Sequence, residues 1–133
     1  MIVQFVEPRF IVGIWDQVKP YIEKALVHTD DYNADQVKVF LTNGSWNLFI
    51  AVEDNILHGV TTVAVENGVN HRTAMITTIS GKGIINKEAM EQLTSILKTS
   101  GITRIQGYAR DSLVRLYQRF GLEKKANLVE FKL

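Results

Sequence analysis

The stretch from residue 75 to residue 122 constrains the fold most, because its apolar spacing changes in a definite order. Residues up to position 79 are expected to form a β-strand, and helical spacing between residues 89 and 97 predicts a helix that closes at Gly101. Residues 102–108 favour a second strand, and a second helix, capped by Asp111 or Ser112, ends at Gly121. This order of elements predicts a βαβ crossover late in the chain.

The remaining residues predict a first strand, a helical region, an antiparallel meander and a last strand. Residues 2–6 favour a strand, and helical spacing over residues 11–27 is interrupted by Pro20, which predicts one bent helix or two short ones. A further helix is expected at residues 34–41. Strands at 46–53, 56–66 and 72–79 form the meander, with tight turns at Asp54-Asn55 and Asn67-Gly68. A last strand is expected from about residue 127 to residue 133.

These elements predict an α+β (mixed α/β) fold with a mainly antiparallel central sheet. The 133 residues suit one hydrophobic core, so residues 1–133 are expected to form a single domain. The net charge is +1, which gives no general attraction to nucleic acid or to an anionic membrane. The chain has no cysteine, and its three histidines lack metal-ligand spacing, so no metal site is predicted. No secretory signal or apolar run near the roughly 20 residues of a membrane span is visible, and we expect a cytoplasmic protein.

Residues 79–86 carry the first candidate site, because a glycine-containing turn lies between a strand and a helix. Backbone amides in such a turn, with the positive end of the helix dipole, form a site for an anion such as pyrophosphate. The simpler alternative is a turn that needs glycine for its backbone geometry. The turn has neither the Walker nor the Rossmann spacing. The candidate binding residues are Ile79, Ser80, Gly81, Lys82, Gly83, Ile84, Ile85 and Asn86.

The second candidate site is the run Leu116-Tyr117-Gln118-Arg119-Phe120-Gly121-Leu122-Glu123. This run resembles the signature of the N-acetyltransferase (GNAT) superfamily, and the Gly81-Lys82-Gly83-Ile84 turn is similar to the pyrophosphate loop of that family. The resemblance implies the GNAT acyl-CoA N-acyltransferase fold, with acetyl-CoA as cosubstrate in a cleft between the strands that end near Ile79 and Tyr108. It also implies that the backbone of the first of these strands pairs with the pantetheine arm.

Four residues depart from the pattern of the family. Ser80 stands in place of Arg or Gln at the start of the loop, and Ile85 in place of Gly or Ala at its end. In the Leu-Tyr helix region, Arg110 replaces Asn and Leu113 replaces Ala. We expect Lys82 and Arg110 to supply charge to the phosphates that the altered loop holds less well.

Tyr117 matches a tyrosine that many family members keep near the departing thiolate, so the resemblance implies that it protonates the sulfur of CoA as a general acid. The alternative is that Tyr117 is a core aromatic residue. No general base is assigned. The predicted function is an acetyl-CoA-dependent N-acetyltransferase, in which a small-molecule or protein amine attacks the thioester directly.

The alternative function is an inactive protein of the same fold that forms a structural or binding part of a larger assembly. The small size and the altered loop also resemble compact GNAT-like proteins of bacteriophages, which would place the chain in the host cytoplasm or in a virion. An exposed edge strand at the C-terminus would allow self-association.

Overall fold

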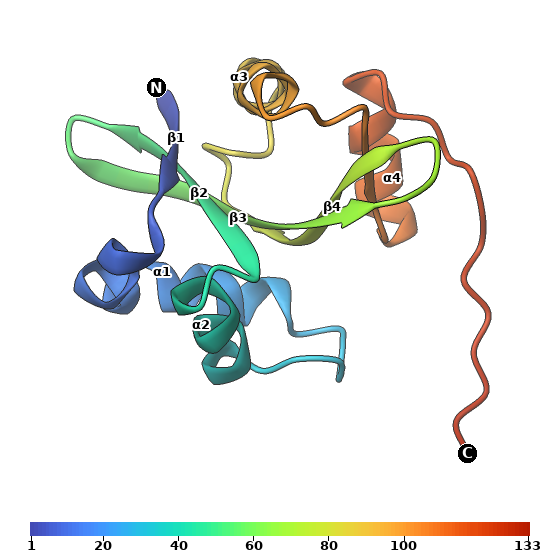
Figure 1. Ribbon diagram of the computed structural model, residues 1–133, viewed down its shortest axis with the longest axis horizontal. Coiled ribbons are helices and arrows are strands. Elements are labelled where there is room, and N and C mark those ends of the chain that lie inside the picture. The colour runs from blue at the N-terminus through green and yellow to red at the C-terminus, as the bar shows by residue number, and fades with distance from the viewer.

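The computed structural model describes all 133 residues and contains one five-stranded sheet with helices on both of its faces (Figure 1). The strands lie in the sheet in the same order as in the chain, from β1 to β5. The elements are β1 (Ile2–Val6), a short 3-10 helix η1 (Pro8–Phe10), α1 (Ile11–Ala25), α2 (Ala34–Thr42), β2 (Trp46–Glu53), β3 (Ile56–Asn67), β4 (Arg72–Ser80), α3 (Lys87–Thr99), β5 (Arg104–Gly107) and α4 (Asp111–Arg119).

The sheet confirms the predicted fold class. Strands β1 to β4 pair antiparallel with their neighbours, whereas β4 and β5 are parallel and are joined by α3. The turn between β2 and β3 is tight, because Asp54 and Asn55 both have positive φ angles, of 53° and 61°. None of the helices is long and apolar enough to cross a bilayer.

Two apolar clusters hold the layers together. Helices α1 and α2 cover one face of the sheet and α3 covers the other, as Figure 1 shows. Val18 and Ile22 of α1 pack with Val37 of α2 on the first face, and Leu93 and Leu97 of α3 pack on the second. Because both faces are covered, the middle strands are buried over most of their length.

The predicted last strand is wrong. Residues after α4 form no strand, and the chain leaves the sheet and ends far from it (Figure 1). The period of two is present between residues 127 and 133, but alternation alone supplies no hydrogen-bonding partner. Lys132 instead pairs with Asp30 in the connection between α1 and α2.

Pro20 lies inside the single helix α1, so the alternative of two short helices is wrong. Pro20 is exposed, and the buried Val18 and Ile22 on either side of it keep the helix docked. The prediction of a tight turn at Asn67-Gly68 is wrong as well. Four residues separate β3 from β4, and the Gly68 amide donates to the carbonyl of His71 at 2.8 Å.

The predicted cap of the last helix is also wrong. Neither Asp111 nor Ser112 occupies the N-cap position of α4, which belongs to Arg110 and has no side-chain hydrogen bond. The extended backbone of Arg110 begins the helix one residue earlier than predicted, so Asp111 falls in the first turn, where its charge favours the helix dipole.

Candidate functional site

The strands β4 and β5 separate in the region where the sequence places the cleft. They are paired from Thr73 with Arg104 to Ile76 with Gly107, where β5 ends. Strand β4 continues to Ser80, so its edge beyond Ile76 has no strand partner on the β5 side. An unpaired strand edge offers a row of backbone donors and acceptors to an extended ligand.

A β-bulge lies at the same point of β4. In the register with β3, Thr62 pairs with Thr78 and Val63 pairs with Ile76, so Thr77 has no partner on β3. The hydroxyl of Thr77 donates to the carbonyl of Thr62 at 3.0 Å, and the Thr62 hydroxyl lies 2.7 Å from those of both Thr77 and Thr78. These side-chain bonds fix the bulge beside the point of separation.

Sequence reasoning did not find this threonine cluster. Its visible signal is a pair of Thr-Thr dipeptides, at residues 61–62 and 77–78, on two predicted neighbouring strands. The fourth member, Thr61, donates its hydroxyl to the carbonyl of Thr78 at 2.8 Å.

The glycine turn packs directly on β3. The amide of Gly83 donates to the carbonyl of His58 at 3.0 Å, and the amides of Ile84 and Ile85 donate to that of Gly81 at 3.2 and 3.1 Å. The side chain of Ile84 is fully buried. The turn is therefore anchored from both its backbone and its apolar side chain.

Glycine is required in this turn because two backbones approach closely. A Cβ atom at Gly83 would lie 2.4 Å from Cβ of His58, and one at Gly59 of β3 would lie 2.6 Å from the amide nitrogen of Ile84. Gly81 has φ of +102°, and its Cβ would meet both the carbonyl of His58 and the ring of Tyr21. The simpler interpretation, a turn that needs glycine for its geometry, thus has a structural basis of its own.

Amides without a protein acceptor remain at the start of α3. Those of Lys82, Lys87 and Glu88 donate to no group of the protein. Asn86 caps the helix, since its Oδ1 accepts from the amide of Ala89 at 2.8 Å and its Nδ2 donates to the carbonyl of Lys82 at 2.8 Å. The free amides and the positive end of the 13-residue helix suit an anion.

The residues that depart from the family pattern take different positions. Ile85 is half-buried and packs against the apolar cluster under α3, and Ser80 is buried at the end of β4. Ile79, before it, is half-buried on the α3 face. The exposed side chains of Lys82 and Arg110 take part in no ion pair, so both charges are available to a ligand.

Tyr117 lies two turns along α4 from Arg110. It is the one buried residue of that helix, with 8% of its surface exposed, and its hydroxyl makes no hydrogen bond within the protein. Burial raises the pKa of Tyr117 to about 12. The phenol therefore keeps its proton at neutral pH. No hydrogen bond or ion pair joins α4 to the glycine turn.

The raised pKa of Tyr117 gives an expected pH dependence of stability. The folded protein holds the proton of Tyr117 up to about pH 12, whereas an ordinary tyrosine has a pKa of 10.0. The stability that the buried neutral phenol contributes is therefore fully present below pH 10 and is lost as the pH rises toward 12. The difference corresponds to roughly 3 kcal/mol. Urea unfolding at pH 9 and at pH 11.5 is expected to show a larger loss of stability for the native chain than for Tyr117→Phe. Equal losses of stability in the two proteins would contradict the raised pKa of Tyr117.

A groove with a volume of about 630 Å³ lies between α3, β5 and the end of α4. No three His, Cys, Asp or Glu side chains gather in a way that could hold a metal ion.

Comparison with known proteins gives structural relatives only. No family model matches the chain, and no curated protein matches it in sequence. An aminoglycoside acetyltransferase from an uncultured soil metagenomic sample, in complex with sisomicin, superposes with a TM-score of 0.74 at 12% identity, over 99% of this chain and 94% of that one. A ribosomal-protein-alanine N-acetyltransferase from Brucella melitensis gives 0.74 at 10% identity, over the full length of both chains.

A third solved structure is that of a protein with acetyl-CoA. A predicted acetyltransferase from Clostridium acetobutylicum, with acetyl-CoA, gives a TM-score of 0.70 at 14% identity, over 98% of this chain and 95% of that one. Likenesses at this identity establish the acetyltransferase fold along essentially the whole chain.

Proposed function

We propose that this protein is an acetyl-CoA-dependent N-acetyltransferase that transfers an acyl group to an amine by direct attack on the thioester. The observation that carries the proposal is the separation of β4 from β5 beside the capped N-terminus of α3. An extended pantetheine arm fits the unpaired edge of β4, and a pyrophosphate fits the free amides that follow it.

In this proposal residues 79–86 bind the cosubstrate. The amides of Lys82, Lys87 and Glu88 receive the phosphates, and the side chains of Lys82 and Arg110 add charge-assisted hydrogen bonds. Tyr117 gives its proton to the departing thiolate. The chemistry needs mainly the placement of two reactants, so a chain of this size is sufficient.

The acceptor is proposed to be a small-molecule amine. The structural likeness to an aminoglycoside acetyltransferase supports this class, and the likeness to a ribosomal-protein-alanine N-acetyltransferase keeps a protein amine as the alternative. No particular amine is assigned, because the fold alone does not select one.

A second candidate function, an inactive structural protein of the same fold, is favoured by one observation. The amides of Gly83, Ile84 and Ile85 already have acceptors inside the protein, which reduces the number left for phosphate. Such a loop would be retained for its packing on β3 rather than for a ligand. Assembly into a phage particle belongs to this alternative.

Binding of acetyl-CoA distinguishes the two functions. By calorimetry, the native chain is expected to bind acetyl-CoA, and Lys82→Ala and Arg110→Ala are each expected to weaken binding by about tenfold, because each removes one charged hydrogen bond. Lys98→Ala, which removes an exposed charge at the other end of α3, is the matched control and should bind as the native chain does.

A thermal-shift measurement tests the same binding by a second method. A ligand present at a hundred times its dissociation constant raises the free energy of unfolding by about 2.7 kcal/mol, which a thermal-shift measurement detects. The absence of both heat and shift with millimolar acetyl-CoA would reject the enzyme and support the structural protein.

A further inference from the structure

The charges of this chain are divided unevenly along its length. Residues 1–66 contain nine acidic and four basic side chains, whereas residues 67–133 contain five acidic and eleven basic ones. The net charge of +1 therefore combines an acidic first half with a basic second half. Because the second half supplies α3, β5 and α4, which border one groove, we expect anions to be attracted to that end of the molecule.

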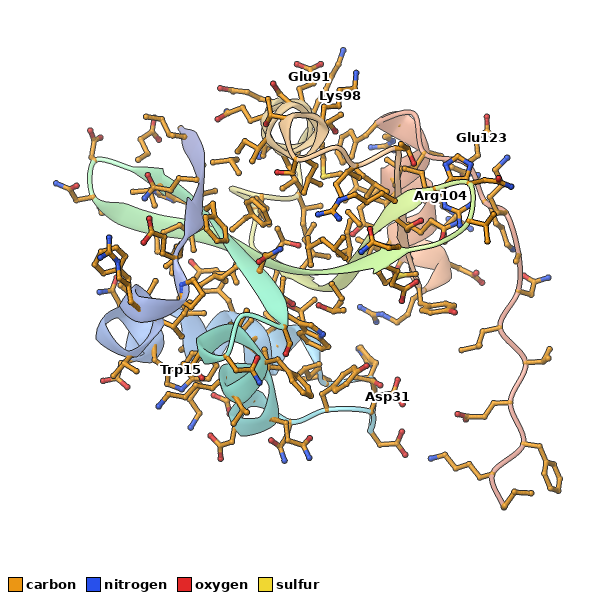
Figure 2. The ribbon with its side chains drawn as sticks, in the orientation of Figure 1. Trp15, Asp31, Glu91, Lys98, Arg104 and Glu123 are labelled. Atoms are coloured by element: carbon orange, nitrogen blue, oxygen red, sulfur yellow. The ribbon has the colours of Figure 1, made fainter.

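The groove between α3, β5 and the end of α4 is bordered by four basic side chains with one acidic side chain, Glu91, among them. The basic residues are Lys87, Lys98, Arg104 and Arg119. All four are exposed, and none takes part in an ion pair. Figure 2 shows Glu91 and Lys98 on α3, on the opposite side of the sheet from Asp31 of the acidic half. The positive charge of the groove is thus uncompensated within the protein.

The floor of the same groove is apolar. Six of its fourteen lining residues are hydrophobic, namely Met90, Leu97, Ile102, Ile105, Phe120 and Leu122. Ile105, Phe120 and Leu122 are only half-buried, so part of their apolar surface is open to solvent. A basic rim around an apolar floor matches a ligand that carries both carboxylates and apolar side chains.

The spread of the basic residues indicates the class of this ligand. Lys87 and Lys98 are eleven residues apart on α3, a distance of roughly 16 Å along the helix axis. A small anion with one head group would reach only one end of that row. A nucleic acid would find a single aromatic ring, Phe120, on which to stack a base. A peptide of about five extended residues spans the same distance and can present several carboxylates.

We propose that this groove is a docking site for a short acidic segment of a partner protein, in which carboxylate and apolar side chains lie close together. The apolar side chains of the segment cover Ile105, Phe120 and Leu122, and its carboxylates pair with the basic rim. Lys87 is the one residue that the groove shares with the proposed acetyl-CoA site. The two sites can therefore be tested separately.

A synthetic peptide tests the docking site. The probe is an amidated seven-residue peptide that alternates leucine and glutamate, labelled for fluorescence anisotropy. The native chain is expected to bind it at least about tenfold more tightly than a peptide that alternates leucine with lysine or one that alternates serine with glutamate. Each of these two comparison peptides lacks one half of the match. Equal binding of the three peptides, or no binding of the probe, would overturn the proposal.

Lys98→Glu tests whether the peptide occupies the groove, and Lys24→Glu is its matched control. Each lysine is exposed in the last turn of its helix, but Lys24 lies on α1, which covers the opposite face of the sheet. Lys98→Glu is expected to weaken binding of the probe by at least about fivefold, because attraction becomes repulsion, and Lys24→Glu by less than about twofold. Equal effects of the two substitutions would indicate general charge attraction and would contradict a docking site.

Two other occupants of the groove predict different results. A second copy of the chain, docked through its acidic half, would make the native protein sediment as an oligomer that the probe dissociates. A single-stranded RNA of twelve nucleotides that binds more tightly than the probe, and loses its binding in Lys98→Glu, would assign the groove to nucleic acid. Either result would replace the proposed partner, whereas a monomer that prefers the probe over the RNA supports it.

Discussion

Gly83→Ala is expected to abolish most binding of acetyl-CoA and to destabilise the fold by about 1–3 kcal/mol, the usual effect of overpacking. The added Cβ would lie 2.4 Å from Cβ of His58 and 2.8 Å from the carbonyl carbon and oxygen of the same residue. Because the main chain of β3 lies in the middle of the sheet, it cannot move aside, so the glycine turn must shift. That shift moves the free amides at the start of α3. Calorimetry and urea unfolding measure the two losses.

The chain offers a matched control for this substitution. Gly13 lies in α1, and a Cβ there would have no atom within 4 Å. Gly13→Ala adds the same methyl group in open space and is expected to stabilise the protein by about 0.5–1 kcal/mol, since alanine favours a helix. If Gly83→Ala behaves like Gly13→Ala, the turn is not packed on β3 as described.

Tyr117→Phe is expected to reduce kcat by about 10²-fold or more while leaving KM and the melting temperature close to native values. A positioned proton donor contributes about that much. The hydroxyl has no hydrogen-bond partner in the protein, so its removal leaves no buried group unsatisfied. The release of CoA thiol can be followed without background, because the protein has no cysteine. The assay uses the best acceptor found in a panel of small amines.

Tyr32→Phe is the control for this variant. Tyr32 packs edge-on against Trp46 and Phe40 on the α1–α2 side of the sheet. Tyr32→Phe, which also loses a hydroxyl, should keep kcat within about twofold of the native value. Full turnover by Tyr117→Phe would instead assign Tyr117 to core packing, the alternative that its burial also allows.

The regular elements up to Arg119 were predictable because their periods are visible in the sequence. The apolar spacing of α3 and the Asp54-Asn55 pair predicted a helix and a tight turn close to where the structure has them. The glycine turn was also located correctly between β4 and α3. Local patterns determine such elements whenever the buried face and the turn residues agree.

The contacts between elements were not predictable in the same way. The bond from the Gly83 amide to the carbonyl of His58 joins the glycine turn to β3 across 25 residues of sequence, and the register that leaves Thr77 unpaired depends on a bulge. No local period encodes either feature. The prediction of a last strand was wrong for a related reason, since the alternation near Phe131 does not by itself supply a hydrogen-bonding partner.

Strands β4 and β5 differ in how firmly they are held, and in the proposed function this difference affects how a ligand would enter. Strand β4 is paired with β3 at every residue except Thr77, and the threonine hydroxyls hold Thr77 at the bulge. In contrast, β5 is paired over four residues and α4 buries one side chain. Few buried contacts give a low free energy of local opening. Amide hydrogen exchange should therefore be fastest, among the regular elements, in β5 and α4, and in the proposed function a ligand would enter by movement of these two elements rather than of β4.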